Sequence, residues 1–168
     1  MLLKLLPKSE VPLLLFIFIG SLIALSGAYL AEFIGFEPCI LCLYQRIPYW
    51  CAIFLCLMGI LARANNKKLF GFILLAIGLA LLCEIGIAFY HVLVEHHIIR
   101  ETTECASSIN LSDNPKIALE QLSATPAISC AHPEIIILGV SMAEWNLLYS
   151  LFLTLIFLHN RLTNVTRR

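Results

Sequence analysis

Four long apolar stretches constrain this chain more than any other feature of its sequence. A helix that crosses the hydrocarbon core of a bilayer needs roughly 20 mostly apolar residues. Only 13% of the 168 residues are charged, whereas soluble domains carry about 25% charge. The sequence therefore predicts an all-α polytopic membrane protein, a four-helix transmembrane bundle that forms one domain over residues 1–168. The predicted helices cover about 11–31, 47–62, 69–90 and 142–158.

Two of these stretches allow a second interpretation. The second one is short, because Pro48 lies near its predicted start and proline is tolerated in the first helical turn. An outward extension would include residues 42–44. The first one resembles a signal peptide, since Lys4 and Lys8 precede it. Its apolar core is longer than the roughly 7–15 residues of such peptides, so we interpret it as a retained helix.

The distribution of lysine and arginine predicts the orientation of the helices. Eight of the eleven basic residues lie at the N-terminal end, in the connection between the second and third helices, and in the C-terminal tail. The other two connections, about 32–46 and 91–141, hold three basic residues and most of the carboxylates. Because inner loops carry the Lys/Arg excess, we expect both termini inside and these two connections outside.

This orientation decides the environment of the cysteines. Cys39 and Cys42 lie in the first outer connection, and Cys105 and Cys130 lie in the second. Both pairs should therefore face an oxidising compartment, where disulfides persist. Cysteines inside apolar helices usually behave as small, inert hydrophobic residues. We expect this of the three others, which are Cys51, Cys56 and Cys83.

Cys39 and Cys42 form a Cys-x-x-Cys motif. Two intervening residues allow a small disulfide ring that opens and closes readily, and this spacing recurs in redox sites. The same spacing begins many zinc motifs. No second Cys-x-x-Cys and no His-x-x-x-His follows, so we favour a redox site and predict no metal centre.

Arg46 follows the motif at a distance that gives it a candidate role. Cys42 is expected near the outward N-terminal end of the second helix, whose amide dipoles favour a thiolate. Arg46 lies one turn further on if the helix extends that far. Its guanidinium could stabilise a thiolate, or the negative charge that develops on an electron acceptor. Alternatively it extends to the lipid headgroups, but the positive-inside bias favours the functional interpretation.

Two further groups of residues are candidates for redox work. Cys105 and Cys130 could form a structural crosslink worth roughly 3–4 kcal/mol, or relay electrons to the first pair through mixed disulfides. Ionisable residues inside membrane segments are functional candidates by default. Three that share one face of the third helix could deliver protons, or could form a polar seam between helices. They are Glu84, His91 and Glu95.

These motifs together resemble the disulfide bond formation protein B (DsbB) family of quinone-linked thiol oxidases. The combination is specific and spans most of the chain in the family's order, although Cys-x-x-Cys alone is common. The resemblance is carried by Pro38-Cys39-Ile40-Leu41-Cys42, Tyr44-Gln45-Arg46, Pro48, Tyr90-His91, Glu95, Cys105, Cys130 and Gly139-Val140-Ser141-Met142-Ala143-Glu144-Trp145-Asn146.

The resemblance implies a quinone cofactor, ubiquinone or menaquinone, near the periplasmic surface of a bacterial inner membrane. Cys39 and Cys42 would be the pair that the quinone oxidises, with Cys42 next to the quinone ring. Arg46 would assist, and the tentative further quinone-site residues are those on the third helix named above. Cys105 would be attacked by a soluble DsbA-like thiol oxidase of the periplasm, and Cys130 would exchange with Cys39.

Two other functions remain open at this stage. A vitamin-K-reductase-like oxidoreductase also has four helices and a Cys-x-x-Cys, but we expect its motif near the end of the bundle rather than before the second helix. A non-catalytic membrane scaffold would carry static disulfides. The zero formal net charge argues against nucleic acid as a partner.

The charge distribution yields a prediction about topology. Reporter proteins fused after Lys68 and after Arg168 should be active as cytoplasmic fusions, and one fused near Asp113 should be active as a periplasmic fusion. Paired alkaline phosphatase and fluorescent protein fusions measure this directly. An inverted pattern would place both cysteine pairs in a reducing compartment and contradict a redox role.

Overall fold

The computed structural model describes residues 10–100, 129–132 and 135–165, and four helices dominate this part of the chain. Each is long and apolar enough to cross a membrane, so the predicted all-α transmembrane bundle is confirmed. A two-stranded antiparallel hairpin precedes the last helix. The elements are α1 Glu10–Ile34, α2 Ile40–Asn65, α3 Lys67–Glu95, β1 Ile136–Ile137, β2 Val140–Ser141 and α6 Met142–Val165.

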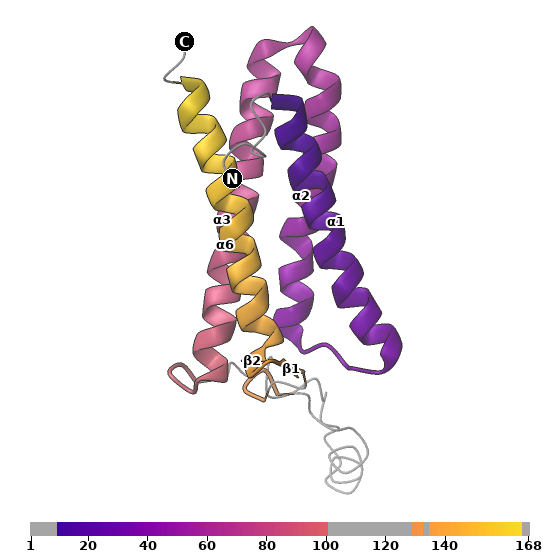
Figure 1. Ribbon diagram of the computed structural model, residues 1–168, viewed down its shortest axis with the longest axis vertical. Coiled ribbons are helices and arrows are strands. Elements are labelled where there is room, and N and C mark those ends of the chain that lie inside the picture. Colours follow the sequence, from indigo (N-terminus) through magenta and orange to yellow (C-terminus); the bar gives the residue numbers. More distant parts are fainter. Residues whose placement is uncertain (1–9, 101–128, 133–134, 166–168) are drawn as a thin grey trace, which may run out of the picture.

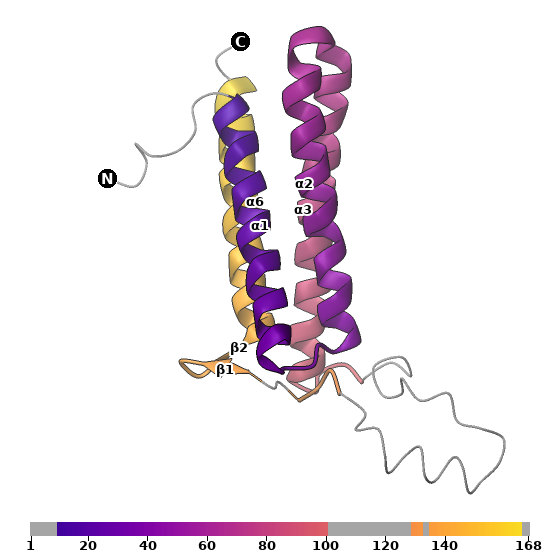
Figure 2. The same ribbon diagram turned by 90° about the vertical axis from the view of Figure 1, so that its right-hand side faces the viewer.

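The helices run alongside one another (Figures 1 and 2). The α1–α2 connection and the β1–β2 hairpin lie at one end, which also holds Cys39 and Cys130 and is called the cysteine end below. The start of α1 and the end of α6 lie at the opposite end. The helices pack in the order α1, α2, α3, α6, and α1 and α6 share fewer contacts than the other neighbouring pairs.

Helix α2 begins at Ile40, well before the predicted start near residue 47. The reason is a cap: Cys39 has extended backbone, and its Sγ accepts a hydrogen bond from the Cys42 amide. Pro48 therefore lies inside the helix, where its nitrogen cannot donate a hydrogen bond and its ring crowds the carbonyl of the preceding turn. Cys42 and Arg46, which the prediction assigned to a connection, lie in the first two turns of α2.

The other helices also extend beyond their predicted ends. Helix α3 continues to Glu95 rather than ending near residue 90, and α6 continues to Val165 rather than to about residue 158. Hydropathy marks the apolar part of a helix, but the main chain continues its own hydrogen bonding into the polar interface. His91 is consequently a helical residue and does not belong to the outer connection.

Tight turns follow the first two helices, one at the end of α1 and one between α2 and α3. At the end of α1, the amides of Gly35 and Phe36 donate to the carbonyls of Glu32 and Ala31, and Gly35 has φ +110°. This is a Schellman motif, whose left-handed residue favours glycine. Asn66 is the single residue between α2 and α3. Its side chain accepts hydrogen bonds from the amides of Lys68 and Leu69 in the first turn of α3.

Small residues allow the helices to approach closely at three levels. A Cβ atom on Gly20 of α1 would lie 2.8 Å from Leu153 of α6, and the Gly20 carbonyl accepts a hydrogen bond from Tyr149 Oη at 2.9 Å. Gly59 of α2 and Gly78 of α3 lie similarly close to neighbouring side chains. Close backbone approach of this kind drives helix association in membranes, where the hydrophobic effect contributes little.

Candidate active site

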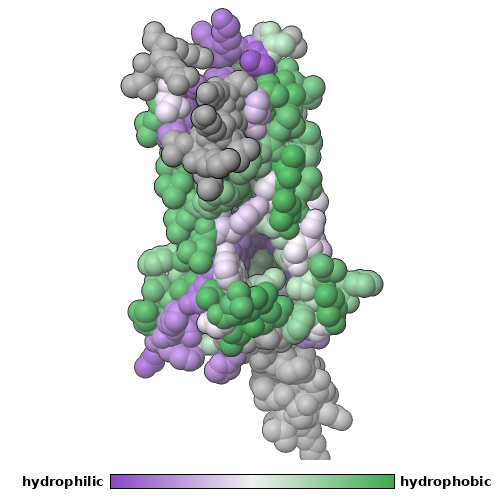
Figure 3. Space-filling view, viewed as in Figure 1, coloured by the Kyte–Doolittle hydropathy of each residue, from purple (hydrophilic) through white to green (hydrophobic). Residues whose placement is uncertain are grey.

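A cavity of about 360 Å³ lies between the helices in the half of the bundle next to the cysteine end. All four helices, the α1–α2 connection and the segment around Cys130 contribute to its wall. Figure 3 shows a hollow on one face of the molecule, with hydrophilic residues visible inside it. Binding sites for small molecules are typically concave and mostly apolar, with a few polar groups that fix orientation. The cavity has this character.

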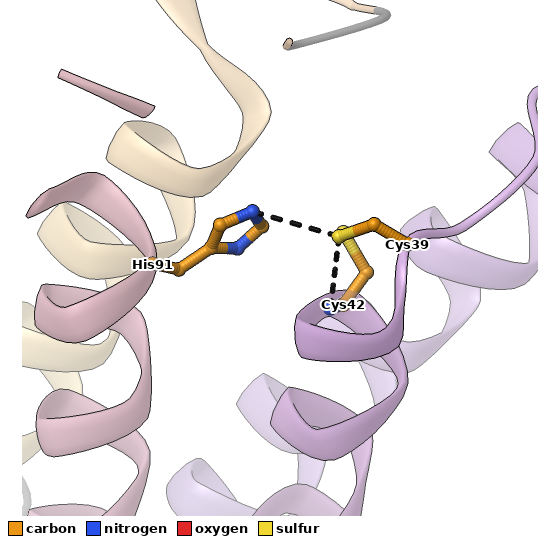
Figure 4. Close-up of side chains that lie close together, drawn as sticks. All are labelled: Cys39, Cys42 and His91. Atoms are coloured by element: carbon orange, nitrogen blue, oxygen red, sulfur yellow. Dashed lines mark hydrogen bonds between the residues drawn. The ribbon is translucent and has the colours of Figure 1, made fainter. Parts of the chain in front are cut away.

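Both cysteines of the Cys-x-x-Cys motif line the cavity. Cys39 Sγ lies 3.1 Å from Cys42 Sγ, and both residues are free thiols here. His91 approaches from α3, with its Nε2 atom 3.5 Å from Cys39 Sγ (Figure 4). Cys39 and His91 are buried, so the motif expected from the sequence sits against a histidine in a largely dry environment.

Cys130 brings the second outer segment to the same place. Its side chain is 1% exposed and packs in a small cluster with Cys39, Leu41 and Val94. The Cys130 side chain also makes a hydrogen-bonding contact with Cys39. Cys39 of the first expected pair is thus in contact with Cys130 of the second expected pair. Cys105 lies outside the residues that the structure describes, so its pairing with Cys130 stays a prediction.

The environment of Cys39 affects its acidity. The contact with Cys130 lowers the pKa of the Cys39 thiol, but the hydrogen bond with Cys42 and burial together outweigh it and raise the pKa to about 12. A thiol with a higher pKa is a poorer leaving group in thiol–disulfide exchange. A nucleophile that attacks a Cys39–Cys42 disulfide would therefore bond to Cys39 and expel Cys42.

Arg46 is buried in the cavity wall. Its residue is 9% exposed, its Nη1 atom lies 2.7 Å from Glu32 Oε2, and its Cζ atom lies 4.5 Å from the centre of the Tyr29 ring. A cation over an aromatic face gains about 0.5–2 kcal/mol depending on its solvation. The ion pair and the ring, both from α1, fix the guanidinium beside the cavity.

The three candidate residues on α3 divide between two places. His91 and Glu95 both line the cavity, with His91 Nε2 3.8 Å from Glu95 Oε1. Glu84 is fully buried away from the cavity lining, and its Oε1 accepts a hydrogen bond from Asn146 Nδ2 at 2.7 Å. Asn146 in turn accepts a hydrogen bond from Tyr49 at 2.8 Å. The expected stripe therefore consists of a pair in the cavity wall and a buried carboxylate whose hydrogen-bond partner, Asn146, lines the cavity.

The start of α6 positions Glu95. The Ser141 hydroxyl donates a hydrogen bond to Glu95 Oε2. Ser141 and Glu144 exchange reciprocal bonds: the Ser141 amide donates to Glu144 Oε2 at 2.8 Å, and the Glu144 amide donates to Ser141 Oγ at 3.1 Å. This is a capping box, a pattern that can be read from Ser-x-x-Glu before an apolar run.

Sequence reasoning missed several residues that complete the cavity. Glu32 and Gln45 line it, as do Tyr49 and Asn146. Asn146 could have been noticed as a polar side chain at the start of an apolar stretch. Gln45 and Asn146 also stand in the motifs that carry the family resemblance. Glu32 and Tyr49 gave no local signal, because their role depends on contacts between helices.

Comparison with known proteins identifies the family. The model of the disulfide bond formation protein DsbB family matches residues 10–160. The chain belongs to this family. It is therefore a multi-pass membrane protein of disulfide-bond formation, with the redox-active character of its family.

Three relatives span much of the chain. The uncharacterized protein RP370 of Rickettsia prowazekii is 38% identical over 141 residues, which cover 82% of this chain and 79% of the relative. Disulfide bond formation protein B of Acinetobacter baumannii is 29% identical over 83% of this chain and 84% of its own length. The SPbeta prophage-derived disulfide bond formation protein B of Bacillus subtilis is 28% identical over 65% of this chain and 68% of its own length.

The raised pKa of Cys39 leads to a prediction for the reduced protein. Only the thiolate is alkylated, and the folded pKa of about 12 lies above the ordinary value of 9.0. The alkylation rate of Cys39 should therefore still be rising at about pH 10, where the same residue in unfolded protein has levelled off. Replacing the neighbour in Cys42→Ala removes a contact that raises the pKa and should move the curve to lower pH. Pulse alkylation with peptide mass spectrometry measures both, and superimposed folded and unfolded curves would contradict this description.

Proposed function

We propose that this protein is a quinone-dependent thiol oxidase of the bacterial inner membrane, which reoxidises a soluble, DsbA-like disulfide oxidoreductase of the periplasm. The observation that carries the proposal is the meeting of Cys39, Cys42 and Cys130 at the wall of one apolar cavity that also contains a buried arginine. A static scaffold would not need its thiols in mutual contact beside such a cavity.

The first exchange joins the soluble partner to the outer cysteine pair. A thiolate of the partner attacks Cys105 of a Cys105–Cys130 disulfide, and Cys130 leaves as a thiolate. The second thiolate of the partner then attacks the partner's first cysteine sulfur, which is bonded to Cys105 in the mixed disulfide, and Cys105 leaves as a thiolate. The partner gains a disulfide, and the two electrons remain on Cys105 and Cys130.

The second exchange passes these electrons to the motif. The Cys130 thiolate attacks Cys39 of a Cys39–Cys42 disulfide and expels Cys42, in keeping with the high pKa of Cys39. Cys105 then attacks Cys130, and the Cys39 sulfur leaves. His91 supports this step, because its Nε2 lies 3.5 Å from Cys39 Sγ and could deliver a proton to a sulfur that leaves poorly as a thiolate.

The cavity fits the quinone that the family implies. It is mostly apolar, and its wall includes Gln45 and Arg46. The buried Gln45 Nε2 and Arg46 Nε donors have no hydrogen-bond partner among the described residues, and buried donors are rarely left unpaired. A quinone carbonyl oxygen is an acceptor of the kind that such donors require. When bound, the quinone accepts two electrons and two protons from the Cys39–Cys42 pair.

Three side chains would serve this acceptor from fixed positions. Arg46 offers a permanent positive charge, and its pairing with Glu32 and Tyr29 limits its movement. His91 lies between Cys39 and Glu95, with contacts of 3.5 and 3.8 Å from the same ring nitrogen. These contacts support a path by which thiol protons reach or leave the cavity. Glu84 lies behind Asn146, so we assign it to orienting that amide.

The proposed orientation places both termini in the cytoplasm and the cysteine end in the periplasm. Its support is the charge distribution: Arg63, Lys67 and Lys68 cluster at the α2–α3 connection, at the end of the bundle away from the cysteines. Inner loops of membrane proteins carry such clusters.

A Cys42→Ser variant tests the electron path. The remaining thiols should still exchange once with the soluble partner, but steady turnover with quinone should stop, because no disulfide can be regenerated at the motif. The matched control Cys83→Ser changes an exposed membrane cysteine and should stay within about twofold of the parent. Stopped-flow thiol exchange and quinone absorbance measure the two steps. Steady quinone turnover in Cys42→Ser would refute the assigned path.

An Arg46→Gln variant tests the role of the guanidinium. A hydrogen bond to a charged group is worth roughly 1.5–3 kcal/mol, so quinone efficiency should fall by about ten- to a hundredfold. Thiol exchange with the soluble partner should change little. The control Arg63→Gln alters the last turn of the same helix at its other end. The turnover rate is measured at several quinone concentrations for the variant and the parent. If the two curves match, Arg46 has no role in the reaction with quinone.

A further inference from the structure

Two helices bring three potential metal ligands together at the motif. Cys39 and Cys42 offer sulfur atoms from the N-terminus of α2, and His91 offers a ring nitrogen from α3. These three atoms all lie within 4.8 Å of one another (Figure 4). Two thiolates and one imidazole form a donor set that suits Zn²⁺ and related soft divalent ions.

The distances from Cys39 to its two neighbours are close to those of a tetrahedral site. With Zn–S bonds of about 2.3 Å and a Zn–N bond of about 2.0 Å, tetrahedral angles require roughly 3.8 Å between sulfurs and 3.5 Å between sulfur and nitrogen. Cys39 Sγ lies 3.5 Å from His91 Nε2, which meets the requirement. Cys42 Sγ lies 3.1 Å from Cys39 Sγ, so the two thiols need to separate by less than about 1 Å.

The charges around the three ligands also suit a cation. Arg46, a permanent positive charge in the same cavity wall, is paired with Glu32 at 2.7 Å. Glu95 adds a carboxylate 3.8 Å from the ligating nitrogen of His91. A three-ligand site leaves a fourth position open. Cys130 contacts Cys39 and could occupy that position.

We propose that the dithiol form of this protein binds one Zn²⁺ ion through Cys39, Cys42 and His91, and that disulfide formation at the motif excludes the ion. Binding forms two Zn–S bonds and one Zn–N bond and releases the two thiol protons, with no change in oxidation state. The same sulfurs cannot hold a metal and form a disulfide. Metal binding and electron transfer are therefore mutually exclusive at this site.

Metal binding itself does not depend on the proposed oxidase function, but its consequence does. In an oxidase, Zn²⁺ would capture the reduced motif and stop its reoxidation, so the ion would act as an inhibitor of the reduced state. Removal of the ion by a chelator would restore turnover, because the thiols are held and not consumed.

The binding test uses the full-length protein in detergent, reduced with a phosphine and freed of reductant under nitrogen. Equilibrium dialysis against Zn²⁺ should find one ion for each reduced chain and none after oxidation with diamide. Cd²⁺, used as a spectroscopic probe, should produce thiolate-to-metal absorption in the ultraviolet only with the reduced chain. Equal binding to the reduced and oxidised protein would overturn the proposal.

Variants assign the ligands. Loss of a side chain that hydrogen-bonds to a metal ligand typically costs roughly 10–100-fold in affinity, so loss of the ligand itself in His91→Gln should weaken binding at least that much. Cys42→Ala should abolish it, and this variant decides the question if His91→Gln does not fold. The control His159→Gln, an exposed histidine in the inner half of α6, should bind like the parent. Unchanged affinity in either ligand variant would refute the assignment.

A separate activity measurement distinguishes this proposal from the proposed function. Quinone turnover is measured without metal, and Zn²⁺ binding is measured without quinone, so either can fail while the other stands. Where turnover is present, saturating Zn²⁺ should abolish it, and a chelator should restore it. Turnover that persists with one bound ion for each chain would show that the ion is held elsewhere.

Discussion

The need of the main chain to satisfy its own hydrogen bonds inside a bilayer governs the rest of this structure. Helices and closed barrels meet this need in lipid, and in this helical bundle irregular backbone is confined to the ends. At the cysteine end, three helix termini are built by specific devices: a Schellman turn after α1, the Cys39 cap of α2 and the Ser141–Glu144 capping box of α6. These same termini supply the site residues, because only there can non-helical chain bring reactive groups together.

Burial of polar groups near the membrane is tolerated here through pairing. Glu32 and Tyr29 hold Arg46, and Asn146 holds Glu84. An unpaired ionisable group in hydrocarbon costs several kcal/mol, so these contacts allow charged side chains to stay in the bundle. These contacts also fix geometry. An arginine that is held by a carboxylate and an aromatic ring loses little conformational entropy when it binds a ligand.

The sequence predicted the parts of this arrangement that depend on local patterns. Hydropathy located all four helices, but not the start of α2, because the Cys39 cap sets this start and Pro48 lies inside the helix and not at its beginning. The Cys-x-x-Cys motif was evident from spacing, and the helical period correctly placed Glu84 and His91 on the buried face of α3. The contact of His91 with Cys39 joins residues 52 apart in the chain, and no periodicity reports such a distance. Cys105 lies outside the described residues, so the outer pair rests on the sequence.

The separation of the motif sulfurs relates its two possible chemistries. A disulfide brings two sulfurs to about 2.05 Å, whereas two thiolates on a tetrahedral metal lie roughly 3.8 Å apart. The distance of 3.1 Å between Cys39 and Cys42 lies between these limits, so small movements of the first turn of α2 in opposite directions reach either state. His91 contacts Cys39 in a manner compatible with both, as a proton donor to a leaving sulfur or as a ligand beside it. The geometry that suits a readily formed disulfide thus also suits a soft metal ion. Whether the dithiol forms a disulfide or binds a metal ion depends on whether an oxidant or the ion reaches it first.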